Sequence, residues 1–365
     1  MKLLRLIKEN EHWNDILRER NVVTRFGGGE YSGLAIFNYD IMADFTDEIV
    51  RECRGVIVDL INGVVVCRPF DKFCNYGEKG ADNIDWRSAK VQDKIDGSIM
   101  KVWYWSGKWR ISTNKTINAF VAPLGDNGNF GDKFLEAAEN VGLDFDALNI
   151  AYTYIFELVS PENRVVIDYI ETTWWHLGTR NNLTGEEVYR YIGVQQPNEY
   201  PITSIKECIE AAKNLNVTGE LVEKEGFVVV DANWHRIKVK SPDYVVVHHI
   251  LPNGGITDEK IFENIRNGEI EEILVYVPSL KERIQKMREK MELFEEKVIT
   301  YIADCRKEVA EIPQGFNTRK IFALAHRTDP LFSIAVKVIF DGKGVSFDKM
   351  PDKRYFSLME KTVKM

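Results

Sequence analysis

The sequence predicts an α+β fold in which antiparallel β-sheets flanked by helices precede a mainly α-helical C-terminal region. Up to about residue 250, aromatic and β-branched runs alternate with polar turns, and helical periodicity appears only at irregular intervals. Beyond that point, apolar residues recur at three- and four-residue steps. The 365 residues suffice for two domains, which we place at residues 1–250 and 251–365.

The first region contains three predicted strand pairs and two predicted helices. Residues 101–113 indicate a hairpin around Ser106-Gly107-Lys108. Residues 151–169 indicate a second pair of strands, which residues 160–163 interrupt, and residues 226–240 indicate a third pair, which turns at 231–233. Helical spacing covers residues 131–142 and 204–215. The stretch Pro252-Asn253-Gly254-Gly255 is typical of a domain boundary.

The second region begins with a long amphipathic helix. Its apolar stripe runs for some thirty residues, from Leu280 to Val309, and Pro313 ends it. Such a stripe is typical of a helix that packs within a helical domain. Shorter helices are expected at residues 317–326 and 330–339, although residues 334–340 are equally compatible with a strand.

Charge and composition limit the class of protein. A net charge of -8 argues against broad, non-specific coating of nucleic acid, yet it allows a local RNA-binding surface. Residues 319–365 contain ten Lys/Arg and five Asp/Glu, a surplus that on charge alone favours a solvated face. No apolar run approaches the ~20 residues of a membrane span. Together with five scattered cysteines and no expected signal peptide, this predicts a cytoplasmic protein with reduced thiols and no membrane partner.

The most informative segment is Lys94-Ile95-Asp96-Gly97-Ser98, because further motifs surround it in a fixed order. Upstream lie Glu52-Cys53-Arg54-Gly55 and Arg68-Pro69-Phe70-Asp71-Lys72-Phe73. Downstream lie Phe156-Glu157, Glu225-Gly226-Phe227 and Lys238-Val239-Lys240. Each fragment is common by itself, since Asp-Gly is ordinary turn chemistry, but the ordered set is specific.

These residue types suit the transfer of a nucleotide to a lysine. A lysine amine attacks phosphorus only when unprotonated, and because its ordinary pKa is about 10.4, burial or neighbouring cations must favour the neutral form. Lys238 and Lys240 lie on one face of a presumed strand, with Ile237 and Val239 on the other. In isolation this pair is typical of an exposed stripe of lysines.

Nucleotide phosphates also require cations and a divalent metal ion. Arg54, Lys72, Lys238 and Lys240 are the candidate cations, and Asp96, Glu157 and Glu225 are the candidate carboxylates. Glycine at positions 97 and 226 would permit a close approach of backbone to the nucleotide. A salt bridge between Arg54 and Glu52 or Asp59 is the structural alternative for that arginine.

The ordered motifs resemble the covalent nucleotidyltransferase superfamily of ATP-dependent ligases and capping enzymes, and within it the RNA ligase 1 family of T-even phages. The resemblance spans roughly residues 34–250, and Cys74 departs from it because an aromatic residue is usual there. It implies an N-terminal adenylyltransferase domain in which Lys94 is the adenylated nucleophile. It also implies that Glu157 and Glu225 bind Mg²⁺, with Mn²⁺ able to substitute. The AMP pocket would then contain Arg54, Lys72, Asp96, Gly97, Glu157, Glu225, Lys238 and Lys240.

The implied function is an ATP-dependent RNA ligase that joins 5′-phosphate and 3′-hydroxyl RNA ends, with repair of nicked tRNA as its setting and no obligate protein partner. The helical C-terminal domain would then select the RNA. A DNA ligase or capping guanylyltransferase is the first alternative, although those enzymes generally carry a small β-barrel where residues 256–312 have helical spacing. A catalytically inactive RNA-binding relative is the second, which the presence of all charged motif residues disfavours.

Overall fold

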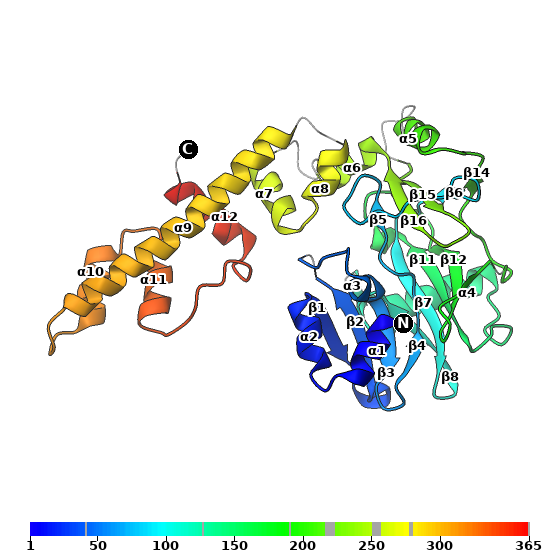
Figure 1. Cartoon of the computed structure of the whole chain (residues 1–365), viewed down its shortest axis with the longest axis horizontal. Helices are drawn as coiled ribbons and strands as arrows, with labels where there is room; N and C mark the ends of the chain where they lie inside the picture. The colour runs from blue at the N-terminus through cyan, green and yellow to red at the C-terminus, as the bar shows by residue number, and fades with distance from the viewer. Residues whose placement is uncertain are drawn as a thin grey trace. The chain divides into compact units, whose positions relative to one another are not determined.

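The computed structural model divides the chain into two compact units, Met1–His248 and His249–Met365 (Figure 1). It describes residues 1–40, 42–125, 128–189, 191–215, 223–249, 257–276 and 280–363. The first unit combines sheets with short helices, and the described part of the second consists of helices and loops. The predicted α+β fold is therefore confirmed. The predicted boundary at residues 252–255 lies outside the described residues, and the role of each domain stays a prediction.

A four-stranded antiparallel sheet, in the order β1-β2-β3-β4, forms the N-terminal part of the first unit. Its strands are β1 (Val22–Phe26), β2 (Leu34–Tyr39), β3 (Arg54–Asp59) and β4 (Val64–Cys67). Helices α1 (Lys2–Glu9), α2 (Trp13–Glu19) and α3 (Glu48–Glu52) bury Leu3, Leu17 and Val50 against it. Asp47 caps α3 by accepting a hydrogen bond from Ile49 N, and β3 begins two residues after this helix ends.

A five-stranded antiparallel sheet follows, in the order β13-β12-β11-β7-β8. Its strands are β7 (Ser98–Trp105), β8 (Lys108–Thr113), β11 (Tyr152–Val159), β12 (Thr173–Asn181) and β13 (Glu187–Val188). The β7–β8 hairpin is the predicted one, and it turns at Ser106 and Gly107 with φ of 50° and 77°. Helix α4 (Phe130–Val141) covers this sheet, and its Phe134 ring stacks on Trp174 with 5.5 Å between centroids.

A second five-stranded sheet has the order β14-β6-β15-β16-β5. Its strands are β5 (Cys74–Asn75), β6 (Lys90–Asp93), β14 (Glu199–Tyr200), β15 (Gly226–Val230) and β16 (Arg236–Lys240). The β15–β16 hairpin is antiparallel as predicted, while β5 pairs with β16 in parallel. Helix α5 (Ile205–Lys213) packs against Phe227, Ile237 and Val239 of this sheet. The remaining short elements are β9 (Pro123–Leu124), β10 (Gly128–Asn129), and 3₁₀ turns at Gly29–Tyr31, Ala119–Val121 and Pro161–Asn163.

One predicted strand is wrong. Residues 164–169 were expected to pair with the strand before them, but the partner of β11 is β12, which starts at Thr173. Instead, the backbone N–H groups of Val166 and Ile167 each donate to Asp96 Oδ2 at 2.9 Å. This segment therefore satisfies its backbone on a carboxylate of the Lys-Ile-Asp-Gly loop rather than on a neighbouring strand.

The described part of the second unit is built around the predicted long helix, α9 (Lys281–Glu311). Ile284, Phe294, Val298 and Cys305 lie on its buried stripe, as their spacing indicated. Residues 332–339 form a helix, which settles the ambiguity with a strand. The other helices of this part of the chain are α7 (Asp258–Arg266), α8 (Ile270–Tyr276), α10 (Thr318–His326), α11 (Phe332–Ile339) and α12 (Asp352–Thr362), and α6 (Pro242–His249) precedes them.

Two predictions from composition can be compared with the structure. No helix in the described ranges is long and apolar enough to cross a membrane. All five cysteines are buried and free of disulfide bonds; their reduced state in the cell stays a prediction.

Candidate active site

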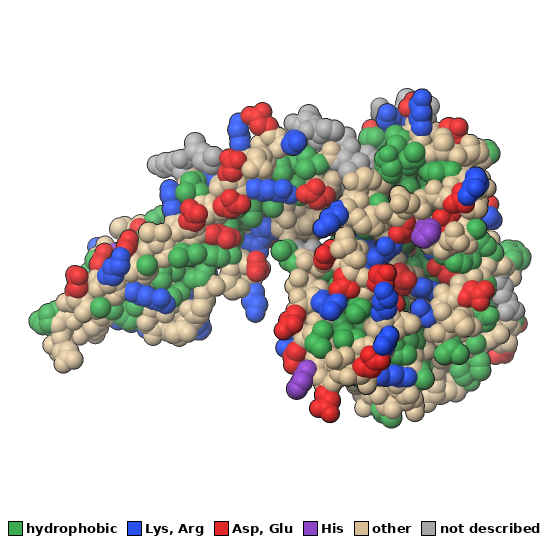
Figure 2. All heavy atoms as spheres, in the orientation of Figure 1, with side chains coloured by type: hydrophobic (Ala, Val, Ile, Leu, Met, Phe, Trp, Pro, Cys, Tyr) green, Lys and Arg blue, Asp and Glu red, His purple; other side chains and the backbone are tan. Residues whose placement is uncertain are grey.

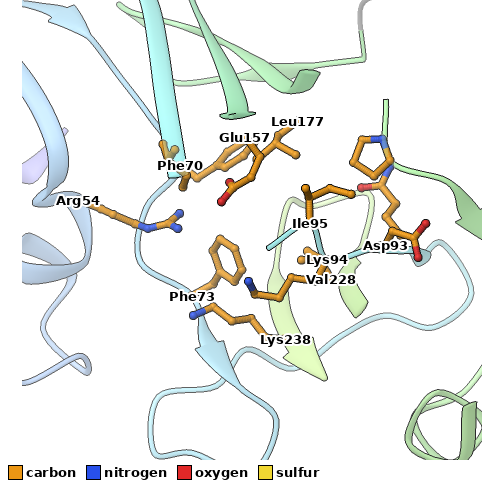
Figure 3. Close-up of a pocket in the computed structure, with 13 residues that line it drawn as sticks. Arg54, Phe70, Phe73, Asp93, Lys94, Ile95, Glu157, Leu177, Val228 and Lys238 are labelled. Atoms are coloured by element: carbon orange, nitrogen blue, oxygen red, sulfur yellow. The ribbon is translucent and has the colours of Figure 1, made fainter. Parts of the chain in front are cut away.

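A pocket lies between the two five-stranded sheets, beside the start of β3. Lys94 and Ile95 line it together with side chains from both sheets (Figure 3). The space between its walls, including the part open to solvent, is about 630 Å³. Its other lining residues are Arg54, Phe70, Phe73, Gln92, Asp93, Ile99, Glu157, Leu177, Pro197, Val228 and Lys238.

Lys94 lies on the loop that joins β6 to β7. Two hydrogen bonds to residues at the start of β15 hold it in place. Its backbone N–H donates to Gly226 O at 2.9 Å, and its Nζ donates to Glu225 Oε2 at 2.6 Å. The Lys94 side chain is 20% exposed and that of Glu225 only 3%. The amine is thus held in one position at the pocket wall while it stays accessible.

The strand register brings Lys240 to the same carboxylate. Gly226 of β15 lies opposite Lys240 of β16, and Lys240 Nζ is 3.4 Å from Glu225 Oε1. The predicted alternation of β16 is confirmed, since Ile237 and Val239 are buried on the other face against α5. Lys238 therefore lines the pocket and Lys240 pairs with the carboxylate that holds Lys94, so the two lysines are not an exposed stripe.

Cations are crowded around Lys238. Burial, reinforced by the positive charges of Lys72, Lys94, Lys240 and Arg54, holds the pKa of Lys238 well below its ordinary value. Figure 3 shows the head groups of Arg54, Lys94 and Lys238 directed toward the space around the Phe73 ring. Because these charges repel one another, an anion bound among them would be strongly favoured.

Glu157 contributes a carboxyl group that is short of partners. It stands on β11, is 9% exposed and faces the pocket in Figure 3. Burial raises the pKa of Glu157 to about 7; Lys94 opposes this shift, while Glu225 adds to it. A cation that entered the pocket would convert Glu157 to its charged form.

Arg54 and Lys72 line different cavities. The Arg54 guanidinium lies 4.9 Å from the centre of the Phe73 ring in the pocket wall. The alternative salt bridges of Arg54 are not formed, because Glu52 accepts from the backbone of α1 and Asp59 from the β3–β4 turn. Lys72 Nζ instead lies 4.6 Å from the ring centre of Phe45 and lines an adjacent cavity.

Asp96 and the two motif glycines serve the protein's own packing. Asp96 is 3% exposed, and besides the two N–H groups described above it accepts from Tyr244 Oη at 2.7 Å. A Cβ on Gly97 would lie 2.4 Å from Leu158 O, and one on Gly226 would lie 2.3 Å from Val239 O. The close approach that these glycines permit is thus to neighbouring strands. Contact of these three residues with a nucleotide stays a prediction.

Two parts of the site were not predicted from the sequence. One is the aromatic wall formed by Phe70 and Phe73; Phe73 precedes Cys74, at which an aromatic ring had been expected. The other is Lys101, a fully buried lysine on β7 whose Nζ donates to Gly55 O, next to Arg54. Burial, opposed by Cys67 and reinforced by Arg54, lowers the pKa of Lys101 to about 8. Its position seven residues after Lys94, amid apolar residues, was the available signal.

Comparison with known proteins agrees with these motifs. Residues 52–244, just over half of the chain, match the RNA ligase family, and every candidate site residue falls within that range. A candidate bifunctional polynucleotide kinase/RNA ligase of Autographa californica nuclear polyhedrosis virus is 33% identical over 275 residues, which cover 69% of this chain and 38% of that protein.

Two further relatives match more evenly. A candidate RNA ligase of Thermovibrio ammonificans is 27% identical over 370 residues, which cover 90% of this chain and 92% of that protein. The RNA ligase of Rhodothermus phage RM378 is 25% identical over 340 residues, covering 75% of each. The resemblance to RNA ligases that the motifs indicated is confirmed.

We expect the wild-type protein to gain stability relative to Lys101→Met as the pH rises above 8. The pKa of Lys101 is about 8 in the folded state, whereas that of a lysine in an unfolded chain is about 10.4. Between these values the unfolded chain binds more protons, so the unfolding free energy of the wild type rises with pH, by up to roughly 3 kcal/mol. Denaturant titrations of both proteins at about pH 7.5 and about pH 9.5 measure the difference. An unchanged difference would contradict this prediction.

Proposed function

The chain belongs to the RNA ligase family, and from that premise we propose that it joins RNA ends at the expense of ATP through a lysyl-AMP intermediate on Lys94. The observation that carries the proposal is the position of the Lys94 amine. It is hydrogen-bonded to a buried carboxylate at the wall of a pocket that Arg54 and Lys238 also line. The RNA ligase assignment, and not the DNA ligase or capping alternative, agrees with the family match.

In the first proposed step, Lys94 Nζ attacks the α-phosphorus of ATP. An N–P bond forms, the bond from that phosphorus to the pyrophosphate oxygen breaks, and pyrophosphate leaves. The amine must lose a proton, and Glu225 Oε2 at 2.6 Å is placed to accept it. Lys240, Lys238 and Arg54 would stabilise the negative charge that the phosphates develop, while Lys72 would act from the adjacent cavity.

Mg²⁺, with Mn²⁺ as a substitute, is the proposed metal ion, and Glu157 fits it because its buried carboxyl group faces the pocket. Both oxygens of Glu225 already face lysines, so Glu225 is the less suited of the two predicted ligands. The described residues form no cluster of three metal-ligating side chains, and phosphate oxygens and water would complete the coordination. When bound, the ion would offset phosphate charge.

Two further steps would complete the reaction. AMP passes from Lys94 to the 5′-phosphate of an RNA, and a 3′-hydroxyl then attacks that phosphate, which seals the strand and releases AMP. We propose nicked tRNA as the substrate, the cytoplasm (that of the host, if the chain is phage-encoded) as the location, and no obligate protein partner. An inactive RNA-binding relative remains the rival, and covalent labelling with ATP separates the two.

Lys94→Ala and Lys94→Arg should both reduce covalent labelling by radioactive ATP to background, while the circular dichroism of the protein is unchanged. Alanine removes the amine, and an arginine guanidinium stays protonated at any working pH. Lys108→Ala, which changes an exposed lysine at the start of β8, is the matched control and should label like the wild type. A Lys94→Ala protein that labels normally would refute the assignment.

Lys240→Ala should slow adenylation from ATP by about a hundredfold, because it removes a charge that stabilises the departing pyrophosphate. Its effect on the sealing of pre-adenylated RNA should be smaller. Glu225→Gln should impair both steps, since Glu225 holds Lys94 and would lie near the ribose or the metal. Single-turnover rates of the two steps provide the test, and a Lys240→Ala protein that adenylates normally but seals poorly would show that Lys240 acts elsewhere.

We also propose that the second unit selects the RNA. Helix α9 has eight Lys/Arg and eight Asp/Glu, and both signs of charge are visible along it in Figure 2, so it gives no net attraction. The basic surplus lies in the residues after it. Lys320, Arg327 and Lys353 are exposed, whereas Arg319 pairs with Asp341 at 3.1 Å.

The triple variant Lys320→Ala/Arg327→Ala/Lys353→Ala should lose preference for tRNA-like ends and bind RNA with a shallower salt dependence, because fewer counterions are released. Three exposed lysines of α9, at positions 281, 286 and 307, provide a charge-matched control triple. Sealing of tRNA-like and unstructured RNA is compared at several salt concentrations. Equal preference in the basic triple variant and the wild type would contradict a selector role.

A further inference from the structure

A second cavity lies at the far ends of the strands that carry the active site. Lys90 at the start of β6 and Val230 at the end of β15 line it, about four residues or roughly 13 Å along the strands from the Lys94 end. It shares Gln92, Leu177 and Pro197 with the candidate active-site pocket, so the two spaces adjoin. Its volume, including the part open to solvent, is about 760 Å³.

Two exposed tyrosines and the partly buried Trp234 line this cavity. Tyr189 is 55% exposed and Tyr191 is 74% exposed, although large rings of this kind are usually at least half buried. The Tyr189 and Trp234 rings lie 4.9 Å apart between centroids, tilted by 37°. Lys90 Nζ lies 4.4 Å from the Tyr189 ring centre. We call Tyr189, Tyr191 and Trp234 the aromatic rim.

Trp234 is held in a strained conformation. Its φ is +65°, a region that suits glycine or asparagine and that a bulky side chain rarely adopts. The buried carboxylate of Asp231 fixes this turn, since it accepts from Asn233 N at 2.8 Å, His235 N at 3.0 Å and Asp85 N at 3.0 Å. At this position of the turn, glycine would adopt the observed φ without backbone strain, whereas tryptophan does not. The presence of tryptophan therefore indicates that its indole ring has a function.

A cationic cavity adjoins this one, and Glu187, Trp234 and Arg236 line both spaces. Four Lys/Arg side chains line it against three carboxylates, and His235 lies beside them. The arginines are oriented by ion pairs such as Arg180–Asp71 at 2.8 Å and Arg236–Glu187 at 2.6 Å. Aromatic rings next to a lining with four Lys/Arg side chains against three carboxylates are complementary to a base and to its phosphate.

We propose that the aromatic rim binds an unpaired base of the RNA strand, with the adjoining phosphate toward the cationic cavity. Single-stranded RNA is recognised in proteins mainly by stacking of splayed bases on aromatic rings beside basic side chains. Gln92 and Gln196 lie in the cavity wall, where their amide nitrogens contact Glu199 Oε1 at 3.2 Å and His176 Nδ1 at 3.4 Å, and their amide oxygens would accept from a base edge. The inference rests on the proposed RNA ligase function and adds a contact remote from the reacting ends.

The test compares Trp234→Gly, Trp234→Phe and Tyr189→Leu with the wild type in the full chain. Binding of a fluorescein-labelled, 5′-phosphorylated single-stranded RNA is followed by anisotropy, lysyl-AMP formation by labelled ATP, and the melting temperature by calorimetry. Trp234→Gly should weaken RNA binding about tenfold or more, the effect of one lost base stack. It should form lysyl-AMP at the wild-type rate and should not melt earlier, because glycine relieves the strain.

Trp234→Phe, which keeps a ring, should bind RNA nearly as the wild type does, and Tyr189→Leu should behave like Trp234→Gly. The matched control is Phe26→Ala, an exposed aromatic on β1 that is 60% exposed and outside both cavities. If Trp234→Gly and the wild type bind RNA with equal affinity, the inference is overturned. The aromatic rim would then be assigned to binding a protein partner instead. A joint loss of RNA binding, adenylation and melting temperature would overturn it in favour of a structural role.

Free AMP distinguishes the source of the base. If Trp234→Gly weakens the binding of AMP but leaves the affinity for RNA at the wild-type value, the rim binds a free nucleotide and the assignment to RNA fails. A wild type that binds RNA but forms no lysyl-AMP would refute the proposed ligase function without touching this inference, since anisotropy requires no catalysis.

Discussion

The interaction on which the site depends is the shared carboxylate of Glu225. It faces Lys94 with one oxygen and Lys240 with the other, and so holds two amines together that would otherwise repel each other. The β15–β16 register and the close contact at Gly226 put the three residues within reach. Even so, the pocket lining has three Lys/Arg side chains against two carboxylates. Burial, and after it the neighbouring cations, lowers the pKa of Lys238 within it. A protein that maintains such a surplus between two sheets is suited to a ligand with several negative charges.

Asp96 shows how the rest of the fold supports this site. One oxygen accepts from two backbone N–H groups of the segment after β11, and the other accepts from Tyr244 of α6. The loop that carries the nucleophile is therefore tied to a segment some 70 residues away and to the last helix of the first unit. These bonds restrict the loop, which matters because catalysis at phosphorus depends on the position of the attacking atom.

The sequence predicted what depends on periodicity and motif order. The β7–β8 and β15–β16 hairpins and the long α9 helix follow from spacing, and the approach of Lys94, Glu225 and Lys240 follows from the family motifs. Long-range polar contacts could not be predicted in this way. The predicted strand at residues 164–169 does not form, because N–H groups of this segment donate to the carboxylate of Asp96, 70 residues earlier. Lys101 was not predicted as part of the site, because its acceptor, Gly55 O, lies on another sheet. Lys72 matched its motif, yet its contacts with Phe45 depend on tertiary packing that no local pattern encodes.

The burial of all five cysteines has a consequence for chemical durability. Oxidants and alkylating reagents attack the thiolate and need access to it. Burial raises the pKa of every one of these thiols, to about 12 in Cys208, so they remain protonated as well as shielded. Cys74, two residues from Lys72 and close to the site, is protected in the same way. The thiols of the folded protein should therefore resist peroxide and iodoacetamide, and an excess of reducing agent should be unnecessary to protect them during handling.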